Sequence, residues 1–374
     1  MGAGPLSTEN FFASPQGAAI VKHTVLGAYI RLFVNKLGST HGTVYYLDGY
    51  AGPGVYGDGT HGSPKLAVEV AELVSEIRDL RCTFVEKDAD HAAALAGLID
   101  DLMPSAVVIH GELQDHVDEI ATRCDDGPLL AFIDPFGLGI SFDSLARLTK
   151  RANTKTDIIM NVSLSALRRV GGQLTSTSAN PTYLKAKATM LGRMDEVLGG
   201  DWWREIWRKA KEAGSDEGAI EIAYEYAQRC KPLRGGYFMV AVKDRWNGPP
   251  AYMLLLLAGH PDANWNFNEM VSIAYDKLRE VDAAGQLLRY QDDYPPILKE
   301  NVRQLLATKT SFIVGDSASK TYGPLLGIAR STHLRSAIKQ MCKDGEIRTT
   351  SVNDKGLPVE NGQGDMQKMT VHRP

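Results

Sequence analysis

Short apolar runs alternate with helix-like stretches through the first two thirds of the chain. A helical pattern at Gly17–Leu37 is followed by strand-like runs at Thr43–Leu47, Cys82–Val85, Ala106–Ile109, Leu129–Ile133 and Asp157–Val162. Helix-like stretches such as Pro64–Leu80 and Asp90–Leu102 separate the earlier runs. Alternation at this spacing predicts a parallel sheet covered by helices on both faces.

The strand signal stops between Ser163 and Leu233, where the pattern is typical of helices. We therefore predict a helical insertion at about 164–235. Strands return at Tyr237–Val242 and Tyr252–Ala258, which would complete a seven-stranded, mostly parallel sheet with its last pair antiparallel. The insertion carries three tryptophans among basic residues, and these either form its core or stack on bases: Trp202, Trp203 and Trp207.

The pattern changes again from about Tyr294. Helical stretches are expected at Ile297–Ala307, Tyr322–Ile328 and Thr332–Cys342, and strands at Glu346–Ser351 and Met366–Val371. Three helices and a two-stranded wing predict a winged-helix-like module. The expected organisation is a lead-in and helix at 1–39, a Rossmann-like domain at 40–290 and this module at 291–374.

Composition narrows the class of protein only a little. With 374 residues, 44% hydrophobic and 23% charged, the chain is typical of a globular protein with a large domain and an added module. Its net charge of −4 confines any nucleic-acid binding to a local basic face. The four cysteines lie far apart, and the longest apolar run is shorter than a membrane span, so we expect a cytoplasmic protein without a membrane segment.

A glycine-rich loop follows the first expected strand, over Asp48–Gly54. Glycines let a backbone turn sharply and approach a ligand closely. The acidic residue at the start of the loop suits the cationic amine of S-adenosylmethionine better than a pyrophosphate. The expected cofactor contacts in this loop are Asp48, Gly49, Tyr50, Gly52 and Gly54.

Acidic residues also follow the next two strands. Glu86 ends the second strand, where a carboxylate can accept hydrogen bonds from both hydroxyls of a ribose. Glu112 follows the third strand and could accept from the adenine amino group, with the backbone at Leu113 beside the ring. Either carboxylate could instead be an ordinary surface residue.

The fourth strand ends in Asp134-Pro135-Phe136-Gly137. An aromatic ring here can stack on a flipped base, while Asp134 and the carbonyl of Pro135 accept hydrogen bonds from an exocyclic amine. We therefore interpret Asp134, Pro135 and Phe136 as the catalytic group. The alternative is a turn that merely ends a strand.

These motifs together resemble the three-Cys-motif partner proteins, which are presumed methyltransferases encoded beside a cysteine-motif protein. The resemblance rests on Val21–Val25, the Asp48 loop, Gly62–Pro64, Phe84–Glu86 and Asp134–Gly137. It implies a class I methyltransferase fold and a cysteine-motif protein as partner. The order of motifs is also similar to that of ribosomal RNA adenine-N6 methyltransferases, whose Asp-Pro-Pro-Tyr differs from the motif here. Asp-Pro-Phe-Gly is similar to the motif of tRNA guanine-N2 dimethyltransferases, and both comparisons favour an exocyclic amine.

Two further places could hold the substrate. The resemblance to the adenine methyltransferases implies that Lys22 and His23 lie over the site and contact substrate phosphate or the cofactor carboxylate, although both could be a solvated helix face. Arg335 and Lys339 would lie along the third helix of the C-terminal module, the helix that reads DNA in winged-helix proteins. That module could equally bind protein.

The sequence thus predicts a methyltransferase that uses S-adenosylmethionine to modify an exocyclic amine of a base, in RNA rather than DNA. No metal is expected, because no His, Cys and Asp cluster has ligand spacing. One alternative is a catalytically weak Rossmann-fold scaffold for the cysteine-motif protein. Another is a small-molecule methyltransferase.

Overall fold

The computed structural model describes residues 17–55, 59, 61–151, 155–177, 180–245, 248–282, 294–353 and 355–374. The expected lead-in at 1–16 lies outside the described residues. The chain divides into two compact units, Met1–Gly259 and His260–Pro374. The sequence-based boundary at 290 therefore falls beyond the division in the structure.

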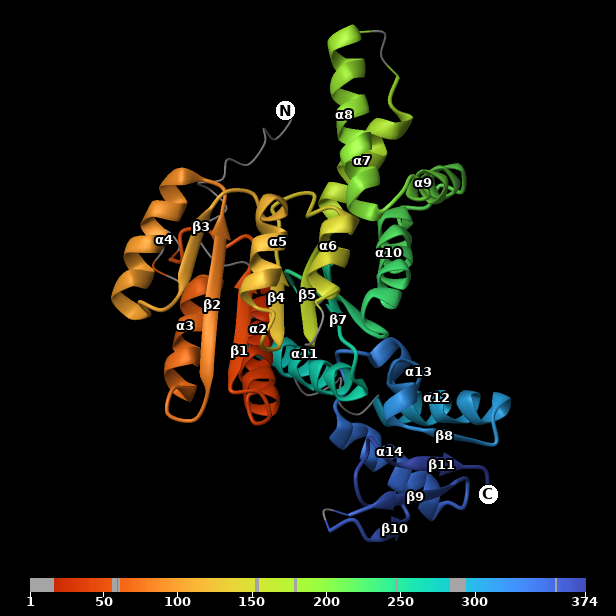
Figure 1. Ribbon diagram of the computed structural model, residues 1–374. Coiled ribbons are helices and arrows are strands. Elements are labelled where there is room, and N and C mark those ends of the chain that lie inside the picture. The colour runs from red at the N-terminus through yellow and green to blue at the C-terminus, as the bar shows by residue number, and fades with distance from the viewer. Residues whose placement is uncertain are drawn as a thin grey trace. The chain divides into compact units, whose positions relative to one another are not determined.

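The first unit is built on a seven-stranded sheet with the order β3-β2-β1-β4-β5-β7-β6 (Figure 1). β7 runs antiparallel to both of its neighbours, and the first five strands pair in parallel. The strands are β1 (Thr43–Asp48), β2 (Asp79–Glu86), β3 (Val107–His110), β4 (Leu129–Ile133), β5 (Thr156–Ser163), β6 (Tyr237–Lys243) and β7 (Pro250–Leu257). The expected α/β fold with a mostly parallel seven-stranded sheet is confirmed.

Helices cover both faces of this sheet (Figure 1). They are α2 (Gly17–Leu37), α3 (Ser63–Val74), α4 (Ala89–Leu102), α5 (Leu113–Arg123) and α6 (Phe142–Thr149). Within the described part of the chain, α2 has the length and apolar character of a membrane span. Its Val21, Val25 and Ile30 are fully buried in the first unit, and a core helix that packs on a sheet has the same composition.

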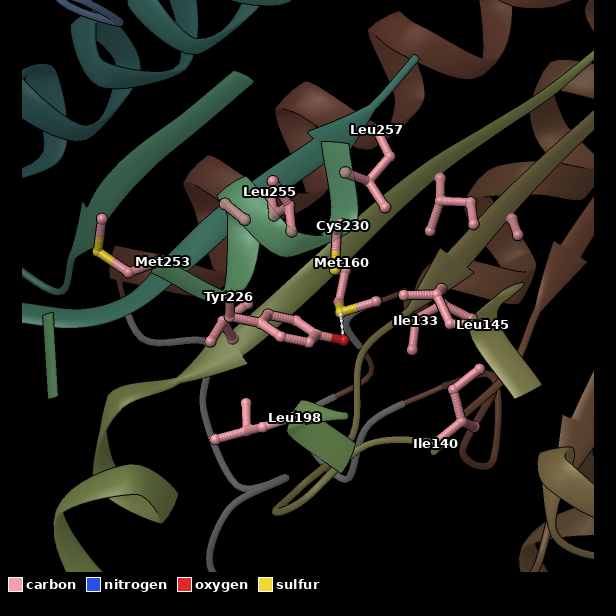
Figure 2. Packing of buried hydrophobic residues seen from close by; sticks show 14 of the residues in the cluster. Ile133, Ile140, Leu145, Met160, Leu198, Tyr226, Cys230, Met253, Leu255 and Leu257 are labelled. Atoms are coloured by element: carbon pink, nitrogen blue, oxygen red, sulfur yellow. Dashed lines mark hydrogen bonds between the residues drawn. The ribbon is translucent and has the colours of Figure 1, made fainter. Parts of the chain in front are cut away.

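The core joins the sheet to the insertion. Every residue of β4 is buried, as expected for a central strand covered on both faces. Figure 2 shows Tyr226 lying against Met160 of β5, where its hydroxyl donates to the sulfur at 3.8 Å. Leu255 and Leu257 of β7 belong to the same cluster. The insertion is therefore part of the first unit's core.

The insertion consists of α7 (Leu164–Thr175), α8 (Pro181–Leu198), α9 (Trp203–Glu212) and α10 (Gly218–Arg234). α7 and α8 project away from the sheet as a hairpin (Figure 1). Trp203 is 0% exposed and Trp207 is 5% exposed. A Cβ at Gly171 would lie 2.4 Å from the Trp207 ring, so α7 and α9 pack closely at this point only because residue 171 is glycine. Of the two interpretations of the tryptophans, a core role holds for Trp203 and Trp207.

The second unit contains more structure than the pattern predicts. Its helices include α11 (Pro261–Asp282), α12 (Tyr294–Thr308), α13 (Ala318–Tyr322) and α14 (Ser331–Lys343). A four-stranded sheet has the order β10-β9-β11-β8, formed by β8 (Ser311–Ile313), β9 (Arg348–Val352), β10 (Pro358–Glu360) and β11 (Thr370–His372). The helix expected at Tyr322–Ile328 is wrong, because α13 ends at Tyr322 and Gly323 takes a left-handed φ of 54°.

Candidate active site

Two cavities lie along the carboxyl ends of the parallel strands, where ligands of open α/β sheets bind. The α2-side cavity, of about 410 Å³, lies between the start of α2, the glycine loop, Asp134 and the start of β7. The β3-side cavity, of about 460 Å³, lies between the same loop and the ends of β2 and β3. Both volumes suit a small-molecule ligand. Tyr50, Pro135 and Phe136 line both cavities.

The glycine loop is held to the sheet by backbone hydrogen bonds. Gly49 N donates to Phe132 O at 2.9 Å, and Ala51 N donates to Val85 O at 3.0 Å. Gly52 and Gly54 have φ values of 65° and 83°, which L-residues rarely adopt. A Cβ at Gly52 or Gly54 would strain the backbone, and a Cβ at Gly54 would also collide with neighbouring side chains. The loop therefore requires glycine at these two positions.

Leu113 supports this loop from below. A Cβ at Gly49 would lie 2.5 Å from the Leu113 side chain, which is itself buried. Both residues line the β3-side cavity. The structure thus brings together Gly49 and Leu113, two predicted cofactor contacts that are far apart in sequence.

Glu86 holds the loop as well as facing the cavity. Its carboxylate accepts from Gly52 N and from Asp88 N, each at 2.8 Å. Glu86 is 8% exposed and lines the β3-side cavity. Each carboxylate oxygen retains a lone pair, because a carboxylate offers about four acceptor sites. The expected acceptor for a diol is therefore available, already oriented by two backbone donors.

Asp48 lies beneath the loop and is fully buried. One oxygen accepts from Tyr50 N at 3.2 Å, and the other has no hydrogen-bond partner of normal geometry. Burial raises the pKa of this carboxyl to about 7, against the lowering effects of the Ser63 hydroxyl and the Tyr50 N–H. Asp48 does not line either cavity, so the expected direct contact with a cofactor amine is not what the geometry presents.

Asp134 is held by residues from two other elements. One of its carboxylate oxygens pairs with the Lys22 ammonium of α2, and the other accepts from Asn161 Nδ2 at 2.8 Å. All three residues line the α2-side cavity. Lys22 is 9% exposed, so this is a nearly buried ion pair rather than a solvated helix face. Neither of the two sequence-based interpretations of Lys22 anticipated this pairing with Asp134.

Phe136 presents its ring to solvent at the mouth of both cavities. It is 57% exposed, which is unusual for a phenylalanine. Pro135 lines both cavities beside it. Pro135 and Phe136 therefore lie where the two cavities meet, and Asp134 beside them lines the α2-side cavity.

His23 carries no charge at neutral pH. Burial and the neighbouring Lys22 ammonium together lower its pKa to about 4, although Asp134 acts in the opposite direction. A neutral imidazole can donate a hydrogen bond but cannot attract a phosphate as a cation. The predicted contact of His23 with phosphate therefore lacks its electrostatic basis.

The remaining predicted contact residues either are exposed or bind another part of the fold. Glu112 is exposed at the N-terminus of α5, where its side chain does not cap the helix, and it lines the β3-side cavity. In the second unit, the Arg335 guanidinium donates to Gly362 O and Gly364 O, so it holds a loop of that unit. Lys339 is exposed. Substrate contacts of Arg335 and Lys339 stay predictions.

Four site residues were missed by the sequence analysis. Asn161 is near the end of β5, where the alternation of apolar and polar residues gave no reason to single it out. Arg168 lines the α2-side cavity, and Arg169 and Arg193 line the β3-side cavity. The signal that could have found Arg168 and Arg169 is their position in α7, directly after a strand that ends at the site, whereas Arg193 lies in α8 and has no such signal.

The topology is consistent with a Rossmann-like methyltransferase: a parallel sheet with one reversed strand, a glycine loop after β1 and acidic residues after β2 and β4. No family model and no curated protein matches the chain.

Solved structures resemble the chain at low similarity. A Legionella pneumophila protein has a TM-score of 0.40 and 10% identity, covering 70% of this chain and 92% of its own. The O-methyltransferase TomG of Streptomyces achromogenes, solved with SAM, has a TM-score of 0.31 and 10% identity over 63% and 79% of the two chains. TYW2 of M. jannaschii, solved with AdoMet, has a TM-score of 0.28 and 12% identity, covering 65% of this chain and 75% of its own. At these TM-scores the likeness carries no argument about chemistry, so the site geometry has to carry it.

Proposed function

We propose that this protein is an S-adenosylmethionine-dependent methyltransferase that modifies an exocyclic amine of a nucleic-acid base, in RNA rather than DNA. The observation that carries the proposal is the position of Asp134, Pro135 and Phe136. Pro135 and Phe136 line both of two ligand-sized cavities and Asp134 lines one of them, next to a glycine loop. One cavity can hold a nucleoside cofactor while the other admits an acceptor.

The residues present fit this cofactor. Glu86 offers free lone pairs to a ribose diol in the β3-side cavity. Asp48, which is buried beneath the loop, gives the site a negative charge when ionised, and this charge favours a cationic amine nearby. The loop glycines allow close approach of the backbone, and open space surrounds the Cβ position of Gly52. When bound, the cofactor supplies a sulfonium methyl group, an electrophile that needs no metal.

Asp134 has the geometry to orient an acceptor amine. Lys22 and Asn161 each occupy one of its oxygens and fix the carboxylate plane. A lone pair is left on each oxygen for an incoming N–H. The carboxylate would then keep the nitrogen lone pair directed at the methyl group and stabilise the charge that develops on nitrogen. Phe136 would stack on the base that carries the amine.

Methyl transfer from tritiated S-adenosylmethionine tests this proposal. The acceptors are total RNA, genomic DNA and a metabolite extract, each incubated with the full chain. Label in RNA that is released as an N-methylated base supports the proposal. Label confined to the metabolite fraction would replace it with the small-molecule activity, and label in none of the three would replace it with a scaffold role.

Two further proposals follow, the first from the helix and strand pattern of the second unit and the second from the resemblance to three-Cys-motif partner proteins. The second unit, with α14 and its strands, would act as a winged-helix-like module that positions substrate through Arg335 and Lys339. A cysteine-motif protein would be the partner. Copurification with a neighbouring cysteine-motif protein tests the partner, and loss of RNA affinity in a chain lacking 260–374 tests the module.

Asp48 should make the stability of the cofactor-free protein fall as pH rises. Its pKa is raised to about 7 in the folded state, so the native protein holds this proton where the unfolded chain has lost it. The resulting stability is complete below about pH 4 and is lost as the pH rises through 7. Between pH 5 and 7.5 the loss should be about 2 kcal/mol.

The Asp48→Asn variant is the matched control, because its amide oxygen can still accept from Tyr50 N. Thermal melts of both proteins across this pH range give the comparison. The difference in stability between wild type and variant should shift in favour of the variant as the pH rises. A difference that stays constant from pH 5 to 7.5 would show that the Asp48 pKa is not raised.

A further inference from the structure

Most of the α7–α8 hairpin carries only positive charge in a chain that is acidic overall, and its two acidic residues, Asp195 and Glu196, lie in the last turn of α8. Residues 163–193 contain five basic residues and no Asp or Glu, whereas the whole chain has a net charge of −4. The five are Arg168, Arg169, Lys185, Lys187 and Arg193. A run of 31 residues without a single acidic residue is a strong local asymmetry, because acidic residues outnumber basic ones in the rest of the chain.

This hairpin begins at the candidate site. α7 starts directly after β5, whose Asn161 contacts Asp134. Arg168 and Arg169 are exposed, and each lines a different one of the two cavities. The hairpin then extends beyond the sheet (Figure 1). Its cations thus start at the cavity mouths and continue outward along the projecting helices.

The hairpin is rigid enough to present these charges. Lys187 Nζ donates to Leu174 O and Ser176 O, and Tyr183 Oη donates to Gln173 Oε1, which ties the two helices together at the tip. At the base, Arg193 donates to Gly139 O and to the Glu196 carboxylate, the latter at 3.0 Å. Lys187 and Arg193 therefore have structural partners.

Arg168, Arg169 and Lys185 differ from these two cations in being exposed. Exposed Phe136 lies beside the base of the hairpin, since it lines the same two cavities as the two arginines. Exposed cations that lead to an exposed aromatic side chain are a combination by which proteins bind single-stranded nucleic acid.

We propose that the α7–α8 hairpin binds the phosphate backbone of a single-stranded RNA segment and delivers one of its bases to Phe136. The inference rests on the proposed function and names the surface that recruits its substrate. Arg168 and Arg169 contact the phosphates on either side of the delivered base, and Lys185 contacts the strand farther out. An unpaired base reaches the cavities without the cost of opening a duplex.

Fluorescence anisotropy with a labelled single-stranded RNA of roughly 12 nucleotides tests this surface. The test variant is Arg168→Gln with Arg169→Gln. The matched control is Arg31→Gln with Lys150→Gln, which removes the same charge from two exposed cations of the first unit. Lys150 follows α6, on the way back to the start of β5, and Arg31 is past the middle of α2, so neither lines a cavity.

The arginine pair should bind RNA about tenfold more weakly, and the slope of log affinity against log salt should fall by about 1.4, or about 0.7 for each lost phosphate contact. The control pair should stay within about twofold of wild type. Equal losses in both pairs would overturn the proposal, because they would reflect net charge alone. The proposal would also be overturned if the wild-type protein did not bind RNA, or if the Arg168→Gln/Arg169→Gln variant bound RNA as tightly as wild type.

Calorimetry with S-adenosylmethionine on the same proteins separates this inference from the proposed function. If the Arg168→Gln/Arg169→Gln variant binds cofactor and RNA as wild type does, the hairpin proposal fails while the methyltransferase proposal stands. If wild type binds RNA through the arginines but does not bind cofactor, the enzyme proposal fails and the hairpin remains an RNA-binding surface. Single-stranded DNA and duplex RNA of the same sequence complete the set, and preference for either over single-stranded RNA would contradict the inference.

Discussion

The Asp134→Asn variant should lose methyl transfer by roughly 100- to 10,000-fold, the range expected when a group that acts in the transition state is removed. Its affinity for cofactor should stay within about threefold of wild type, because Asp134 lines the α2-side cavity and not the cavity assigned to the nucleoside. The amide keeps an acceptor for Asn161 but loses the negative charge that faces the amine and Lys22. Single-turnover transfer and calorimetry measure the two quantities separately.

The Asp134→Asn experiment needs a control for stability, because Asp134 forms an ion pair with Lys22. Replacing one partner of a nearly buried ion pair leaves the other charge without compensation, which can destabilise the fold. The double variant Lys22→Met with Asp134→Asn removes both charges. It should recover thermal stability without recovering activity, whereas a return of activity with stability would show that Asp134 acts only in folding.

The second large effect is expected at Glu86. Glu86→Ala should weaken cofactor binding by about 100-fold, because it removes the acceptor for a diol and the anchor of Gly52 N together. Two hydrogen bonds to a charged group correspond to about this loss, at 1.4 kcal/mol for each factor of ten. Calorimetry with S-adenosylmethionine gives the number directly.

Two comparisons make the Glu86 experiment specific. Glu86→Gln keeps the shape and one acceptor oxygen, so it should cost about tenfold. Glu112→Ala removes an exposed carboxylate from the same cavity and should cost only a few-fold. A Glu86→Ala affinity within twofold of wild type would contradict the assignment of the β3-side cavity to the nucleoside.

Much of the first unit could be predicted from the sequence, since its strands are either fully buried or followed by turn residues. The bounds of α2 and β4 match the apolar patterns at Gly17–Leu37 and Leu129–Ile133. The glycine loop and the strand-end acids could be placed at one edge because parallel strands bring their carboxyl ends together. Local patterns failed in the second unit, where β8 and β10 are three residues each and too short to show alternation.

Contacts between distant residues could not be predicted. Lys22 and Asp134 are 112 positions apart, and nothing in either local sequence indicates that they pair. The complete burial of Asp48 could not be predicted either, because the position of a side chain above or below a loop depends on how the loop folds back. The low pKa of His23 follows from burial and from Lys22, which are tertiary effects.

Calorimetric titration of the wild-type protein with S-adenosylmethionine tests the central claim most directly. The account predicts one molecule bound per chain, with a dissociation constant between about 1 µM and 1 mM, the range in which enzymes commonly hold their substrates. No heat of binding and no rise in melting temperature at about 1 mM cofactor would contradict it.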